Sequence, residues 1–114
     1  MQYLLLFTLV SNGMLNSKMD FMKDRDEFYK KLKVNLEETT KFPSKYMFKF
    51  IIPADEAKSK KINDIFNYTG AVINTKPSKT GKYKSLTILV IMKDADEVII
   101  KYKEVATVEG VISL

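Results

Sequence analysis

Cysteine and histidine are both missing from this sequence of 114 residues. Without cysteine the chain has no disulfide framework, no thiol nucleophile and no thiolate metal site. Without histidine it lacks the commonest general base and the commonest metal ligand. These absences exclude histidine-dependent hydrolase triads, zinc sites and other histidine-based metal centres. We therefore expect no bound metal and no cofactor.

Arginine is almost missing as well, because Arg25 is the one arginine among 19 basic residues. The net charge of +5 favours anionic partners such as nucleic acid or a membrane surface. Base-specific readout and bidentate phosphate binding rely mainly on arginine, however. A surplus made of lysine is more often a matter of solubility, so it is weak evidence for nucleic acid.

A long hydrophobic run is the third missing feature. The apolar segment Tyr3–Val10 is far shorter than the roughly 20 residues that a membrane-spanning helix needs. A secretory signal would begin with basic residues, but the first one is Lys18. We expect residues 1–22 to be an extension outside the fold and expect no membrane association. An export signal and an extra strand packed on the surface are the alternatives.

The remainder, residues 23–114, has the pattern of one α+β domain. Its first element is a helix over residues 24–40, since Asp24 and Glu27 have capping-box spacing and Phe28, Leu32 and Leu36 recur every fourth residue. This stripe docks either on its own domain or on a partner, and the first is the simpler expectation. Strands are then predicted over 45–52, 71–76, 83–92 and 108–114, and helices over 53–69 and from Asp94 to about Val105.

After the N-terminal helix, the predicted elements follow in the order strand, helix, strand, strand, helix, strand. This order predicts a ferredoxin-like βαββαβ sandwich with a four-stranded antiparallel sheet, preceded by the N-terminal helix. Right-handed crossovers place both crossover helices on one face and leave the other sheet face open. The predicted core is Phe48, Phe50, Leu86, Ile88 and Val90 against Ile62, Ile65, Phe66, Val98, Tyr102 and Val105.

The stretch from Ser78 to Met92 is the most informative part of the chain for function. Pro77, Ser78, Lys79, Thr80 and Gly81 are typical of a turn. Lysines at 76, 79, 82 and 84 surround this turn and could hold an anion together with free backbone N–H groups. A solvated hairpin tip explains the same lysines and is the simpler interpretation. Gly81-Lys82 is no phosphate-binding loop, because the spacing of that motif is absent.

Several segments of the chain resemble the YbeD-like family of small uncharacterised bacterial proteins. They are Phe42-Pro43, Tyr46-x-Phe48-Lys49-x-Ile51, Ser78-x-x-Gly81-Lys82-Tyr83-x-Ser85, Tyr102-Lys103-Glu104 and Gly110-Val111. The resemblance covers about residues 28–114. It implies a ferredoxin-like domain similar to the amino-acid-sensing ACT regulatory domains, a cytoplasmic location and no established activity. It also implies a role in regulating lipoate metabolism.

One departure concerns amino-acid binding. ACT domains that bind amino acids usually carry glycine in the first strand-to-helix loop, whereas residues 52–56 contain none. Amino-acid binding is therefore in doubt for this chain.

Two functional hypotheses follow. The first is a non-catalytic regulatory or interaction module that binds a protein partner or a small anion through the open sheet face and the basic turn, a surface that can also serve as a homodimer interface. The second is a single-stranded nucleic-acid-binding domain, although only Tyr83 matches the aromatic pattern of RNA-recognition strands. An enzyme is not expected, because Asp64, Asp94 and Asp96 have capping or solvation roles. The candidate binding residues are Lys49, Ser78, Lys79, Gly81, Lys82, Tyr83 and Ser85.

Overall fold

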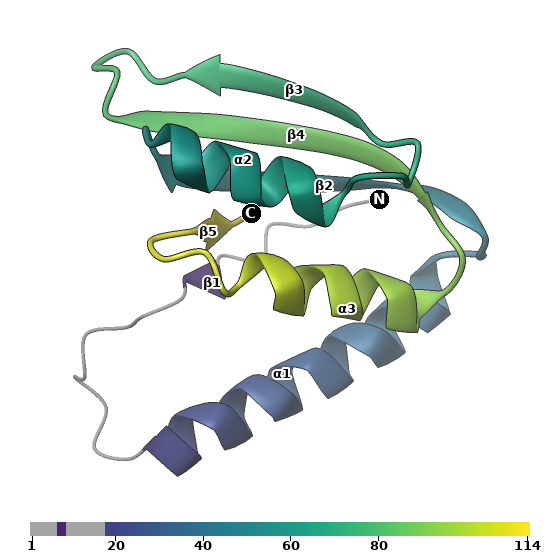
Figure 1. Cartoon of the computed structure of the whole chain (residues 1–114). Coiled ribbons are helices and arrows are strands. Elements are labelled where there is room, and N and C mark those ends of the chain that lie inside the picture. The colour runs from purple at the N-terminus through teal and green to yellow at the C-terminus, as the bar shows by residue number, and fades with distance from the viewer. Residues whose placement is uncertain (1–6, 9–17) are drawn as a thin grey trace.

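The computed structural model describes residues 7–8 and 18–114, and within them the strands form one antiparallel sheet (Figure 1). The strand order is β1-β5-β2-β4-β3, and every neighbouring pair is antiparallel. The four expected strands are therefore present, with a two-residue strand added at one edge. The strands are β1 Phe7–Thr8, β2 Ser44–Pro53, β3 Val72–Pro77, β4 Tyr83–Met92 and β5 Ile112–Ser113.

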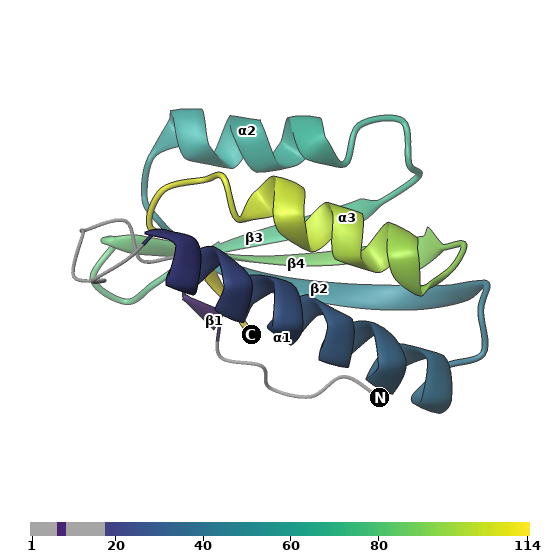
Figure 2. The same cartoon turned by 90° about the horizontal axis from the view of Figure 1, so that it is seen from below.

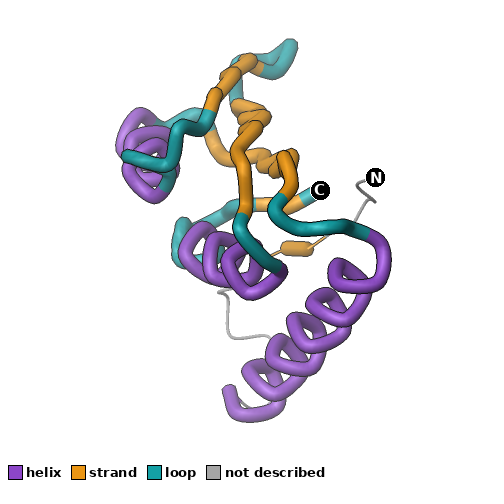
Figure 3. The backbone as a smooth tube through the Cα atoms, turned by 90° about the vertical axis from the view of Figure 1, so that its right-hand side faces the viewer, coloured by secondary structure: helices purple, strands orange, loops and turns teal. Residues whose placement is uncertain are grey.

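Three helices accompany the sheet, namely α1 Lys18–Thr39, α2 Glu56–Ile65 and α3 Ala95–Val105. Both crossover helices, α2 and α3, lie on one face of the sheet, as Figure 3 shows. Helix α3 lies between α2 and α1 (Figure 2), and α1 contacts α3 rather than the open sheet face. The chain is thus an α+β ferredoxin-like sandwich with an additional N-terminal helix.

Side-chain alternation along β2 and β4 determines which sheet face becomes the core. The two strands pair over their full length, with Phe48 opposite Ile88 and Phe50 opposite Leu86. All four of these side chains are completely buried. Because the side chains of a strand alternate between faces, the residues between them point to the other side of the sheet. The predicted core is confirmed, except that Ile65 is only partly buried.

The N-terminal helix is longer than its capping pattern suggested. Helix α1 begins at Lys18 instead of Asp24, so residues 18–22 belong to a helix. Its apolar stripe docks on its own domain, since Tyr29, Leu32 and Leu36 are buried in the common core. Within the expected extension, Phe7–Thr8 pairs with Ile112–Ser113, and the expectation for residues 1–6 and 9–17 lies outside the described residues.

The second helix and the last strand are shorter than expected. Helix α2 ends at Ile65 instead of Thr69, and Tyr68 has a positive φ of 62° in the turn that follows. Strand β5 contains two residues instead of seven, because Gly110 turns the chain with a φ of 82° just before it. A Cβ atom at Gly110 would lie 3.0 Å from the Pro53 side chain, so this glycine allows a close approach to the end of β2.

A buried hydrogen bond joins the sheet to α3. The hydroxyl oxygens of Tyr46 and Tyr102 are 2.9 Å apart, and both side chains are buried. Burial raises the pKa of Tyr102 far above its ordinary value, and it also raises the pKa of Tyr46. Because the two hydroxyls are hydrogen-bonded to each other, neither is an unsatisfied polar group in the core.

Candidate functional site

The candidate site is the sheet face opposite α2 and α3, which we call the open face. None of the side chains whose burial is described is buried on this face, and no described helix lies over it (Figure 3). Three of the large apolar side chains that are exposed to solvent lie here: Tyr83 at 48%, Val72 at 59% and Ile91 at 65%. Strand register assigns this face Lys45, Met47, Lys49, Ile51, Pro53, Val72, Asn74, Lys76, Tyr83, Ser85, Thr87, Leu89, Ile91 and Ile112.

Register also orders the open face into rows that run across the strands. One row is apolar and contains Met47, Leu89 and Val72 on β2, β4 and β3. The next row is polar and contains Lys49, Thr87 and Asn74. Directly opposed residues in antiparallel strands lie close enough to act together on one ligand. The face therefore offers apolar contact beside lysine and hydroxyl groups.

The residues predicted from the sequence divide between this face and the neighbouring turn. Lys49, Tyr83 and Ser85 lie on the open face, where Lys49 is opposite Thr87, and Ser85 lies between Ile51 and Lys76. The remaining four are in the β3–β4 turn at one end of the sheet, and they are Ser78, Lys79, Gly81 and Lys82. The structure thus brings the predicted residues to one surface and its rim rather than into a cavity.

Most of the backbone N–H groups of the turn already have partners. The Gly81 N–H donates to the Ser78 carbonyl at 3.0 Å, and the Tyr83 N–H donates to the Ser78 hydroxyl at 3.2 Å. The Lys82 N–H is directed at the Thr80 hydroxyl at 3.4 Å. An anion cradle needs several free N–H groups that point to one place. The turn therefore offers the side chains of Lys79 and Lys82, both exposed, rather than a backbone cradle.

Lys84 differs from the other three lysines around the turn. Its side chain points to the helical side of the sheet, where its ammonium group lies 2.6 Å from the Glu56 carboxylate. Alternation explains this, because Lys84 lies between Tyr83 and Ser85, which both face the open side. Lys76, Lys79 and Lys82 are thus the lysines that the hairpin presents to solvent on and beside the open face.

Acidic residues are confined to one part of the fold, whereas lysines occur in both helices and strands. All 14 acidic residues lie in helices, in their caps or in the loop before β5. No acidic residue occurs in 39–54 or 65–93, the two segments that hold β2, β3 and β4. These segments carry eight lysines, and in the described structure Lys84 is the one of them in an ion pair. The open face is therefore basic, although the helices have mixed charge.

The acids that sequence analysis considered for catalysis are engaged in local interactions. The Asp94 carboxylate accepts a hydrogen bond from the Glu97 N–H at 2.8 Å and caps α3. Asp64 is paired with Lys60, whose hydrogen bond lowers the pKa of that carboxyl. Asp96 is paired with Lys33, and the hydrogen bond between them raises the pKa of this lysine. These three carboxylates thus have structural roles on the surface.

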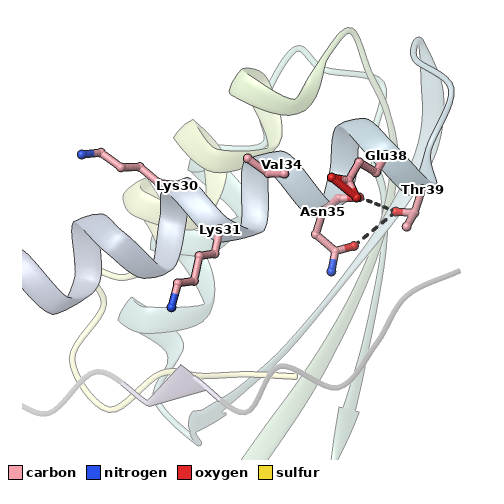
Figure 4. Close-up of a pocket in the computed structure, with 6 residues that line it drawn as sticks. All are labelled: Lys30, Lys31, Val34, Asn35, Glu38 and Thr39. Atoms are coloured by element: carbon pink, nitrogen blue, oxygen red, sulfur yellow. Dashed lines mark hydrogen bonds between the residues drawn. The ribbon is translucent and has the colours of Figure 1, made fainter.

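A shallow hollow lies elsewhere, on the exposed side of α1 (Figure 4). Its described lining comes from this helix alone and mixes two lysines with one acid and polar groups. The Thr39 hydroxyl donates to the Asn35 carbonyl at 2.7 Å, so these side chains serve the end of the helix. None of the predicted binding residues lies there. The lining residues are Lys30, Lys31, Val34, Asn35, Glu38 and Thr39.

Sequence reasoning missed the contribution of β3 to the open face. Val72 and Asn74 lie beside Leu89 and Thr87, but this neighbourhood depends on the register between two strands. The signal in the sequence was the alternation of the strand itself, which places residues 72, 74 and 76 on one face. The face to which they belong becomes known only from the pairing with β4.

The fold and its open face define the class of this protein: a small ferredoxin-like α+β domain with one bare, basic sheet face. The comparisons with known proteins assign the family. Residues 37–114 match the model of a family described as a protein of unknown function, DUF493. The chain belongs to this family, which is the YbeD-like family of small uncharacterised proteins. No curated protein and no solved structure matches the chain.

No helix among residues 18–114 is both long enough and apolar enough to cross a bilayer. The same part of the chain contains no cluster of three acidic side chains that could hold a metal ion.

Proposed function

We propose that this protein is a non-catalytic interaction module that binds a protein partner or a small anion through its open face. One observation carries the proposal: an exposed sheet face combines apolar side chains with lysines, and its strands carry no acid. Exposed apolar surface beside charged groups is typical of an interaction site. The family resemblance supports an ACT-like regulatory role and a cytoplasmic setting for it.

The engagement of the surface acids supports a non-catalytic role. Asp64, Asp94 and Asp96 are each used in an ion pair or a helix cap. General acid–base catalysis needs a side chain that is free to exchange a proton with a substrate. Turnover by the purified protein that is lost on substitution of one of these acids would contradict this part of the proposal.

Nucleic-acid binding is less well supported by the open face. Base stacking needs aromatic side chains on the central strands of such a sheet. Among the described residues the open face carries one aromatic side chain, Tyr83, which lies at the end of β4 beside the turn. The aromatic residues Phe48 and Phe50 of β2 are buried on the opposite face.

The test is affinity capture of partners from native cell extract by the full-length chain, with and without nuclease. The diagnostic variant reverses the charge at two lysine positions and combines Lys49→Glu with Lys82→Glu. The matched control makes the same change of charge at two exposed lysines of the helices, Lys31→Glu with Lys61→Glu. We expect the first variant to lose capture and the second to retain it. Equal retention by both folded variants would contradict the proposal, and capture that depends on nucleic acid would replace it with the alternative.

A further inference from the structure

The edge of the sheet at β3 is open within the described structure. This strand is last in the order β1-β5-β2-β4-β3, so one of its two sides has no neighbouring strand among the described residues. Five of its six residues, all except Ile73, are exposed. An exposed strand edge presents backbone donors and acceptors to which another chain can add.

The hydrogen-bonding pattern shows which backbone groups of β3 point outward. The Ser78 N–H donates to the Tyr83 carbonyl at 2.8 Å, which makes these two residues a hydrogen-bonded pair. Such pairs alternate along antiparallel strands, so Lys76, Asn74 and Val72 direct their backbone groups toward β4. The outward N–H and C=O groups therefore belong to Ile73 and Thr75. Pro77 has no N–H group and ends the usable edge.

The side chains of β3 specify the chemistry of a strand that adds there. On the open face an incoming strand would meet Val72, Asn74 and Lys76 in this order. On the helical side it would meet Ile73, which packs against the core. Beyond Lys76 lie the exposed lysines of the turn, Lys79 and Lys82. The edge is thus apolar at its start and strongly basic at its end, and no acid lies on the strands beside it.

We propose that the β3 edge binds a strand of a protein partner, with acidic residues opposite Lys76 and the turn, and apolar residues opposite Val72 and Ile73. An antiparallel strand continues the pattern of the sheet and carries its acids in the N-terminal half and its apolar residues in the C-terminal half. This inference rests on the proposed interaction function and identifies the chemistry of the partner.

Synthetic peptides test the chemistry and the direction of the added strand. The probe has acidic residues in its first half and Val, Thr and Ile in its second half. One control has the reversed order, and a second has lysine in place of each acid. We expect the full-length protein to bind the probe more tightly than either control. Amide hydrogen exchange should slow at Ile73 and Thr75, while Asn74, whose N–H points to β4, should change little.

Two variants separate strand addition from general attraction of charge. Thr75→Pro removes an outward N–H without removing a bond to β4, and we expect it to weaken probe binding by about tenfold. Its control is Thr75→Val, which keeps the N–H and should bind normally. Lys76→Glu should weaken binding of the acidic probe by about fivefold and strengthen binding of the lysine peptide.

Three outcomes would overturn the inference. If the reversed peptide bound as tightly as the probe, the added strand would not have the proposed antiparallel direction. Self-association of the protein with slowed exchange at Ile73 and Thr75, without peptide, would assign the edge to a second copy. Capture from extract that is lost in the Lys49→Glu, Lys82→Glu variant but kept by Thr75→Pro would uphold the proposed function while rejecting strand addition at β3.

Discussion

The pair formed by Tyr46 and Tyr102 is the clearest case in which single residues determine stability. Either Tyr→Phe substitution leaves the other hydroxyl buried without its partner, 2.9 Å away in the intact protein. We expect each single variant to lower the free energy of unfolding by about 1–3 kcal/mol. The double variant Tyr46→Phe, Tyr102→Phe should cost less than the sum, because no orphaned hydroxyl remains. Denaturant unfolding of the parent, the two single variants and the double variant measures the coupling energy between the two hydroxyls. Strictly additive losses of stability would contradict the pairing.

The same pair makes stability depend on pH in the alkaline range. Burial raises the pKa of both hydroxyls in the folded protein above the ordinary value of 10.0. Above pH 10 the folded state therefore holds protons that the unfolded state releases. The contribution of the two tyrosines to the free energy of unfolding is complete below pH 10 and is lost as pH rises above it. The slope is at most about 1.4 kcal/mol per pH unit for each tyrosine. The double Phe variant should show a shallower decline above pH 10 than the parent, and equal slopes would contradict the assignment.

Among the elements, α1 has the most independent position. Most of it precedes residues 37–114, which the family model covers, and it packs on α3. Its contacts there include an ion pair of 2.9 Å between Lys33 and Asp96, and the Lys103 ammonium lies 5.3 Å from the Tyr29 ring centre. These contacts attach the helix to α3 rather than to the sheet, so α1 should be able to detach by itself.

Leu32→Asp tests this independence of α1, because it introduces a charge into the buried stripe of the helix. We expect a loss of about 3 kcal/mol in the local free energy of opening, and about a hundredfold faster amide exchange in α1. Exchange in β2 and β4 should remain slow. Val34→Asp is the matched control, since Val34 is 53% exposed on the same helix. Faster exchange throughout the sheet would show instead that α1 is essential to the core.

Element types were predictable from the sequence, but several boundaries were not, among them the start of α1, the end of α2 and the start of β5. Alternation identified β2 and β4, because both are long strands with one wholly apolar face. It failed at the C-terminus, where Val108 and Val111 are buried like strand residues although the chain turns at Gly110. At α1 the capping pattern of Asp24 and Glu27 lies inside the helix, since capping residues are also ordinary residues of a solvated helical face.

The candidate site shows the same limit of prediction at the level of single residues. Alternation within β4 placed Tyr83 and Ser85 on one face without knowledge of the fold. It also separates Lys84 from them, although the sequence analysis counted Lys84 among the charges of the turn; the structure pairs it with Glu56 on the other side. The neighbourhood of Lys49, Thr87 and Asn74 could not be predicted, because it arises from register between strands that are distant in sequence.

At the scale of the whole molecule, the distribution of charge matters more than its sum. The net charge of +5 is modest, but the acids are confined to the helices, their caps and one loop. The potential of the open face is therefore more positive than the net charge suggests, and an anionic surface should be approached by this face first. The lysines of the helices contribute less, because acids such as Asp64 and Asp96 lie among them.

Cation-exchange chromatography shows through which face the protein adsorbs to an anionic surface, and it requires no knowledge of the partner. Two double variants are compared: Lys49→Glu with Lys82→Glu on the sheet face, and Lys31→Glu with Lys61→Glu on the helices. Each replaces two lysines by glutamates, so the net charge of each variant falls from +5 to +1. A resin that senses net charge alone would release them at the same salt concentration. We expect the sheet-face variant to elute at clearly lower salt than the helix variant, because it loses the face through which the protein adsorbs. Coelution of the two folded variants would show that no basic face exists. It would also remove the charge complementarity on which an acidic partner strand at β3 depends.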